Sequence, residues 1–396
     1  MLPVSPRRWS WPLAGWLALV AGVYTLAVIA TAAANPGHVD PAMTTAMNLL
    51  HTGSPSIGFS PGANDTVTRN GATYHVISLG PVLPYLLFAP FETLYLASGW
   101  VTSLAFGILA ASLAWPLAGA YGLSGPRRRW FAALVAFGTL LFPLSVRGDM
   151  YYLAHAEAMA ATFFALIEWQ GRRRAPVIGG AFAVAALARP TVLVAIVPLG
   201  AWLLWNSRSR VRTAVGLVAP LAAGLVAMGA WNAARFGSPL ESGYSIAQLN
   251  QPTLAALRSQ GTFSLRHVGP NLATLLAAGF GVRDAFPWLV PSNWGQSILL
   301  TTPALVAGVW APWRDRTVRV MSAAALLVTA VILSYYGGAG WQTYGYRYFL
   351  DATPFLLVLV ALAMRVRFGR PERLLIVLSV AFCTYGVVAG VMHLGA

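Results

Sequence analysis

Long apolar stretches, separated by short arginine-rich segments, run along almost the whole chain. Several of them reach about 20 residues without a charge, which is the length a helix needs to cross a bilayer. The pattern predicts apolar spans at 12–33, 99–121, 130–146, 151–169, 176–188, 190–205, 213–234, 295–312, 318–336, 349–364 and 374–394. We therefore expect an all-α polytopic membrane protein of about 11 transmembrane helices, with residues 1–396 as a single transmembrane domain.

Composition agrees with this pattern. The chain is 57% hydrophobic and only 9% charged, and its mean hydropathy is +0.65. Soluble domains carry about a quarter charged residues, so this chain lacks the polar surface that water requires. A soluble enzyme with one membrane anchor is excluded.

The arginine clusters predict how the chain crosses the membrane. All 26 basic residues are arginine. The predicted spans place every second connecting segment on the same side of the membrane, and the segments on one side hold 18 arginines and three acids. The remaining segments hold eight arginines and eight acids, so the net charge of +15 lies entirely on one side. The positive-inside rule places that side in the cytoplasm, together with the N-terminus. We expect a multi-pass protein of the inner or plasma membrane and no nucleic-acid partner.

The stretch 176–205 begins and ends beside basic clusters, so it must enter the membrane and return. Two short helices, broken at Arg189-Pro190, satisfy this requirement, because proline removes a backbone donor and disfavours helix in the residue before it.

Two long segments are predicted on the outer side. The first, 34–98, contains helix-like pieces at 40–51 and 81–97, which we expect to lie in the outer membrane interface. The second, 235–294, holds Gly, Pro, Asn and short amphipathic stretches. Any chemistry is expected to face outward.

Two charged residues are the first candidates for chemistry. Asp40 precedes Pro41, an arrangement typical of a helix N-cap, although a partly buried carboxylate there is also a candidate general base. Arg189 lies in an apolar stretch, where a charge is costly. It is expected either to pair with Glu157 or Glu168, or to bind an anionic headgroup through its planar guanidinium.

The outer segment 335–354 is the least generic part of the chain. Its aromatic residues are consistent with an interfacial belt, but a belt does not need the accompanying Gln342 and Arg347. Aromatic faces with amide and guanidinium donors suit a sugar or a phospholipid headgroup.

Other motifs point to little. His38 and Asp40 have no clear third metal ligand, and Arg147-Gly-Asp149 is a short outer turn whose likeness to an adhesion tripeptide is chance. Walker and GxGxxG nucleotide motifs are absent, which indicates a lipid-linked donor if the protein transfers a group.

Five segments, in this order along the chain, carry a resemblance to a known family. They are Asp40 to Gly53, Asn70 to Pro90, Gly179 to Thr191, Arg235-Phe-Gly-Ser-Pro239, and Gly340 to Arg347. The set resembles the GT-C superfamily of membrane glycosyltransferases, in the branch that uses polyprenyl-phosphate sugars and includes bacterial mannosyl- and aminoarabinosyl-transferases. The resemblance implies a GT-C-like helix bundle.

The resemblance also implies an inverting transfer on the extracytoplasmic side. Asp40 would deprotonate an acceptor hydroxyl, and Arg189 and Arg347 would hold the donor phosphate as its charge grows. The sugar or acceptor would be lined by Tyr74, His75, Trp341, Gln342 and Tyr344. No cofactor or metal ligand is implied, although a divalent metal is not excluded. The acceptor would be a glycolipid, a polymer or a protein.

Two other functions remain open from the sequence. A lipid or solute transporter or flippase would also use a broken helix with a charged residue, as at Arg189. A structural subunit would tolerate Asn at position 40 without loss of function.

Overall fold

The computed structural model describes residues 11–35, 40–58, 60, 62–87, 95–338, 340 and 343–393. Six helices in these ranges are long and apolar enough to cross a membrane. They are α1 (Trp11–Ala34), α4 (Tyr95–Ala120), α7 (Met150–Gln170), α10 (Arg210–Phe236), α14 (Arg316–Ser334) and α16 (Arg370–Val391). The protein is thus a largely helical polytopic membrane protein, as the apolar pattern predicts.

Three predicted spans are shorter apolar helices. They are α8 (Ala175–Ala188), the 3-10 segment η2 (Pro190–Ala195) continued by α9 (Ile196–Trp205), and α15 (Thr353–Val366), which follows the 3-10 turn η5 (Arg347–Asp351). The predicted break at Arg189-Pro190 is confirmed, since Arg189 has an extended backbone between α8 and η2.

Two other predicted spans are not single α-helices. The stretch 130–146 divides into α5 (Gly125–Phe137) and α6 (Leu141–Ser145), and the break falls at Gly138, a poor helix former. The stretch 295–312 consists of α13 (Ile298–Thr301) and the 3-10 helix η4 (Pro303–Trp310). Pro303 excludes the α conformation from Thr302, whose ψ is 62°.

The first outer segment carries helices and a hairpin. The predicted helix at 40–51 is α2 (Pro41–Thr52). Within the predicted helix at 81–97, α3 (Leu79–Tyr85) ends at Tyr85, 88–94 lie outside the described residues, and α4 begins at Tyr95. Between α2 and α3, β1 (Thr66–Arg69) pairs antiparallel with β2 (Ala72–His75). The sequence patterns did not predict this hairpin.

The second outer segment has short elements only. They are α11 (Pro252–Arg258), η3 (Leu265–His267), α12 (Val268–Ala277) and the antiparallel strands β3 (Gly281–Val282) and β4 (Leu289–Val290).

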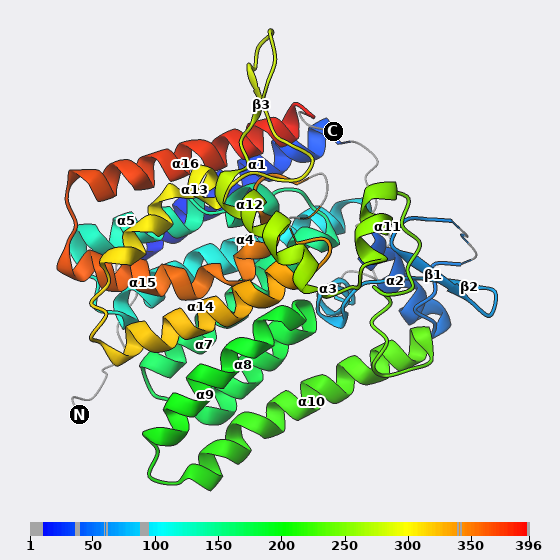
Figure 1. Ribbon diagram of the computed structural model, residues 1–396, viewed down its shortest axis with the longest axis horizontal. Helices are drawn as coiled ribbons and strands as arrows, with labels where there is room; N and C mark the ends of the chain where they lie inside the picture. The colour runs from blue at the N-terminus through cyan, green and yellow to red at the C-terminus, as the bar shows by residue number, and fades with distance from the viewer. Residues whose placement is uncertain are drawn as a thin grey trace.

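The long helices run roughly lengthways through the molecule (Figure 1). The turns α7–α8, α9–α10 and α15–α16, which carry arginine clusters, lie at one end, and α2, α11 and the hairpin β1–β2 lie at the opposite end. Two clusters touch at the basic end, because Arg127 Nη1 donates to the Arg365 carbonyl over 2.8 Å. This segregation fits the arginine pattern, from which the charge rule predicts that this end faces the cytoplasm.

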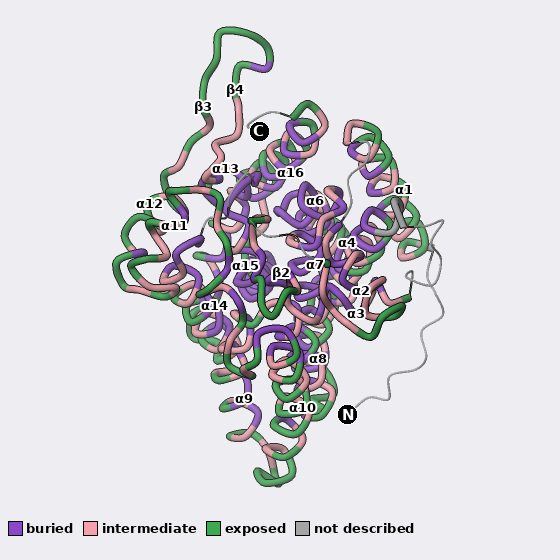
Figure 2. The backbone as a smooth tube through the Cα atoms, turned by 90° about the vertical axis from the view of Figure 1, so that its right-hand side faces the viewer, coloured by how far each residue is buried: buried purple, intermediate pink, exposed green. Residues whose placement is uncertain are grey.

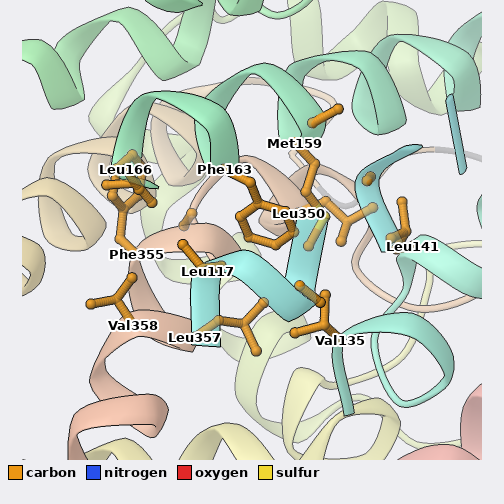
Figure 3. Packing of buried hydrophobic residues seen from close by; sticks show 14 of the residues in the cluster. Leu117, Val135, Leu141, Met159, Phe163, Leu166, Leu350, Phe355, Leu357 and Val358 are labelled. Carbon is orange, nitrogen blue, oxygen red and sulfur yellow. The ribbon is translucent and has the colours of Figure 1, made fainter. Parts of the chain in front are cut away.

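The buried core lies along α4, α5, α7 and α15, while most of α10 is exposed or only partly buried at the edge (Figure 2). Phe163 of α7 packs among Leu117, Leu350 and Leu357, which come from α4, η5 and α15 (Figure 3). Such close packing, rather than a water-driven effect, holds helices together in lipid. It fixes the ends of α7, α8 and α15, from which the candidate site is built.

Candidate functional site

Asp40 caps the first turn of α2. Its Oδ1 accepts hydrogen bonds from the backbone N–H groups of Ala42 (2.7 Å) and Met43 (3.4 Å), and Pro41 occupies the first helical position. The predicted cap is therefore confirmed. The side chain is buried, and its Oδ2 makes no hydrogen bond.

A second carboxylate, Asp149, lies beside Asp40. Asp149 caps α7, with Oδ1 accepting from the Tyr151 N–H over 2.8 Å. Gly99 of α4 lets the two caps approach, since a Cβ atom there would lie 2.8 Å from the Gly148 carbonyl oxygen and 3.3 Å from the Asp40 Cβ. Burial, and then the charge of Asp149, raises the pKa of Asp40 to about 8. The pair therefore holds a proton near neutral pH.

Asp149 also faces a polar cavity of about 240 Å³. Its wall combines carboxylates, amides and aromatic rings with one guanidinium, that of Arg347. The main polar lining residues are Asn64, Asp65, Asp149, Tyr151, Gln251 and Arg347. Asp40 does not line this cavity and lies behind Asp149.

Arg347 belongs to η5 and is buried among tyrosine rings. Its guanidinium carbon lies 4.9 Å from the ring centre of Tyr348 and 5.5 Å from that of Tyr151, and its Nη2 donates to the Tyr348 hydroxyl over 3.2 Å. Its Nε has no hydrogen-bond partner, and the charge of Asp149 lies near enough to act on the guanidinium. Arg347 is thus a buried cation with donor capacity to spare.

Arg189 is held by an ion pair that the sequence analysis assigned to other residues. Its Nη2 lies 2.9 Å from Asp351 Oδ2, and its Nε donates to the same carboxylate. The expectation of Glu157 or Glu168 as its partner is wrong. Glu168 instead pairs with Arg174 at 2.8 Å, and Oδ1 of Asp351 also contacts His155 Nδ1 at 2.9 Å.

The position of Arg189 depends on how α3 meets α8. A Cβ atom on Gly80 of α3 would lie 2.6 Å from the Ala188 backbone, so only glycine allows this approach. Arg189 follows Ala188 directly and stacks its guanidinium on Tyr348, 4.5 Å from the ring centre. The Thr191 hydroxyl, just beyond the break, donates to Asp351.

A second cavity, of about 220 Å³ and mostly apolar, adjoins the first. Arg189 lines it together with Ile77, Met228, Phe263 and Ile332. Tyr244, Tyr335 and Tyr348 line both cavities, and Arg189 and Arg347 share a small hollow between them. The two predicted phosphate ligands therefore lie where the polar and apolar cavities meet.

Three of the other predicted site residues, Tyr74, His75 and Tyr344, do not line these cavities. Tyr74 and His75 lie on β2, and the His75 carbonyl accepts from Arg235 Nη1 at 2.6 Å. Tyr344 is buried against α16, where its hydroxyl donates to the Phe382 carbonyl over 2.5 Å. Trp341 and Gln342 lie outside the described residues, as does His38.

Asp149 and Asp351 are the residues that the sequence analysis missed. Asp149 was set aside as part of an outer turn, yet an acid just before an apolar helix is the signal of a cap at a membrane surface. Asp351 lies four positions after Arg347 in the segment already singled out, but its pairing with Arg189 leaves no local pattern. Within the described ranges, no three His, Cys, Asp or Glu side chains come together as metal ligands.

Comparison with protein-family models, characterised proteins and solved structures gives no match for this chain. The functional argument therefore depends on the geometry of the two cavities.

Proposed function

We propose that the protein is a membrane glycosyltransferase of GT-C type. It would transfer a sugar from a polyprenyl-phosphate donor to an acceptor hydroxyl on the extracytoplasmic side. One observation carries this proposal: a polar cavity with Asp149 in its wall adjoins an apolar cavity, and two arginines lie at the junction. A lipid-linked sugar has the same order of parts, namely an apolar chain, a phosphate and a polyhydroxylated ring.

The arginines fit the phosphate. Arg347 has an unused buried donor, and Arg189 presents a guanidinium to both cavities while Asp351 fixes its orientation. The two guanidinium groups thus lie close together at the junction. Preorganised cations of this kind stabilise negative charge that develops on a leaving group.

One member of the carboxylate pair would serve as the general base. The pKa of about 8 keeps a proton on Asp40 near neutral pH, whereas Asp149 is the carboxylate at the cavity wall. Asp149 would accept the proton of the acceptor hydroxyl, whose oxygen attacks the anomeric carbon. The bond from that carbon to the phosphate oxygen breaks, polyprenyl phosphate leaves with the electron pair, and the configuration inverts. Asp40 would then be a positioning residue rather than the base implied by the family resemblance.

The test is sugar transfer by the purified protein in lipid. A panel of radiolabelled polyprenyl-phosphate sugars is offered with a native lipid extract as acceptor, to the wild type and to Asp149→Asn and Asp40→Asn. Loss of a general base costs about 10²- to 10⁴-fold in rate, so Asp149→Asn should lose transfer while it still binds donor. Asp40→Asn should lose less, because Asn keeps the cap.

Asp315→Asn is the matched control, because Asp315 caps α14 at the arginine-rich end through the Thr317 N–H at 2.8 Å. Full transfer by both site variants would overturn the proposal. A larger loss in Asp40→Asn than in Asp149→Asn would return the base to Asp40. Lipid movement across the bilayer without transfer from any donor would favour a flippase.

A further inference from the structure

The hairpin β3–β4 projects from the protein without covering any other element (Figures 1 and 2). It extends sideways, across the direction of the long helices. Four of its apolar side chains are widely exposed: Val282 (80%), Phe286 (67%), Trp288 (62%) and Leu289 (42%). The rings of Phe286 and Trp288 meet edge to face, with centres 5.4 Å apart. An apolar projection of this kind marks an interaction surface.

The base of the hairpin is fixed to a membrane-length helix. The Tyr385 hydroxyl of α16 donates to the Leu289 carbonyl, and Phe280 packs on Phe382 and Tyr385. Tyr385 precedes the end of α16 at Val391 by six residues, which is about 9 Å at the helical rise per residue. The hairpin therefore leaves the bundle near the outer end of a lipid-facing helix, where Val388 is also exposed.

The carbonyl groups of the hairpin turn find their hydrogen-bond donors within the turn. Arg283 Nε donates to the carbonyls of Ala285 (3.0 Å) and Pro287 (3.1 Å), and its Nη2 donates to that of Phe286 (2.6 Å). Its backbone N–H donates to the Trp288 carbonyl over 3.0 Å. One arginine thus satisfies four successive carbonyls, which a segment in a water-poor phase requires and a segment in water does not.

We propose that this hairpin is a membrane anchor that inserts Phe286 and Trp288 into the boundary between headgroups and acyl chains of the outer leaflet. Trp and Phe favour this depth, and interfacial segments are buried about 5–10 Å into the boundary. The site is continuous with the exposed face of α16 and does not depend on the proposed transferase activity.

The hairpin β1–β2 provides a matched control. Its turn, Arg69-Asn70-Gly71, is also exposed but is polar. Two variants with a single cysteine each are made, Phe286→Cys and Asn70→Cys. Both are made in a Cys383→Ala background, because Cys383 is the chain's one cysteine. Each is labelled with an environment-sensitive fluorophore in the full-length protein, reconstituted in phosphatidylcholine nanodiscs.

Two quenchers then report the surroundings of each label. We expect iodide in the water to quench the label at 286 several-fold less than the label at 70, and lipids with a spin label at acyl position 5 to quench it several-fold more. Equal iodide quenching at the two sites would overturn the proposal. Shielding from iodide without quenching by the spin-labelled lipid would also overturn it, because a second copy or another protein would then cover the hairpin. Trp288→Cys repeats the measurement if Phe286→Cys does not fold.

Discussion

Arg189 and Asp351 form a buried ion pair across 162 positions of the chain, with 2.9 Å between Nη2 and Oδ2. The pair joins the break between α8 and η2 to the turn η5, which also carries Arg347. It therefore fixes the distance between the two arginines at the cavity junction. His155 of α7 completes the connection through Oδ1 of the same carboxylate.

Removal of one partner of this pair should destabilise the protein severely. Asp351→Asn leaves the Arg189 charge buried without its counter-charge, a change that costs about 3–5 kcal/mol. We expect a lowered melting temperature in detergent and the loss of donor binding. The double variant Arg189→Gln/Asp351→Asn removes both charges, so it should recover much of the melting temperature but not donor binding. A double variant as unstable as Asp351→Asn would contradict this account.

The charge state of Asp40 should make stability depend on pH. Its pKa is raised to about 8, far above that of an unfolded Asp, so the folded protein binds this proton more tightly than the unfolded chain. The resulting stabilisation is complete below about pH 4 and is lost as the pH rises through 8. Asp40→Asn keeps the cap and removes the titration.

Melting temperatures measured between pH 5 and 9 check this expectation. As the pH rises, the melting temperature of Asp40→Asn should increase relative to that of the wild type. If the difference between the two melting temperatures stayed constant with pH, or if the melting temperature of the wild type increased relative to that of the variant, Asp40 would not be held protonated.

Local sequence signals predict the elements that depend on local chemistry. The span 151–169 is found as α7 because a long apolar run alone specifies a membrane-length helix. Asp40-Pro41 likewise predicts the cap of α2, because the hydrogen bonds of this cap reach only two or three residues ahead in the sequence. The division of 130–146 is less readable, because an apolar run looks alike whether it is one helix or two packed pieces.

The site is less predictable because its contacts are distant in sequence. The cost of a buried charge predicts that Arg189 needs a partner, but which acid supplies it depends on where η5 folds back. The approach of Asp149 to Asp40 depends in turn on a glycine of a third element, Gly99. The hairpin β1–β2 has strands of four residues, too short to show a clear alternation.

Gly99→Ala should separate the two carboxylates. The new Cβ atom would lie 2.8 Å from the Gly148 carbonyl oxygen, so the loop that carries Asp149 must move. Overpacking of this kind costs about 1–3 kcal/mol, and misplacement of the base should lower transfer at least as much as it lowers stability. Gly180→Ala in α8 is the control, since nothing lies within 4 Å of its Cβ position and Ala favours helix. Normal transfer in Gly99→Ala would show that the spacing of the carboxylates does not matter.

Arg347 should bind the donor phosphate through the geometry of its guanidinium as well as its charge. Its Nε is buried without a partner, and its plane contacts several tyrosine rings. A hydrogen bond to a charged group contributes about 1.5–3 kcal/mol, so Arg347→Gln should weaken polyprenyl-phosphate binding about 10- to 100-fold. Arg347→Lys should recover only part of this affinity, because an ammonium group is not planar and cannot stack on the rings or make the paired, parallel hydrogen bonds of a guanidinium.

Competition between polyprenyl phosphate and a labelled donor, measured in nanodiscs, would rank the three proteins. Arg266→Gln is the control, because Arg266 is an exposed arginine of η3 that lines neither cavity. If Lys restored full affinity, Arg347 would act as a point charge only. If Gln bound as tightly as the wild type, the phosphate would have to lie elsewhere, and the assignment of the two cavities to lipid and sugar would fail with it.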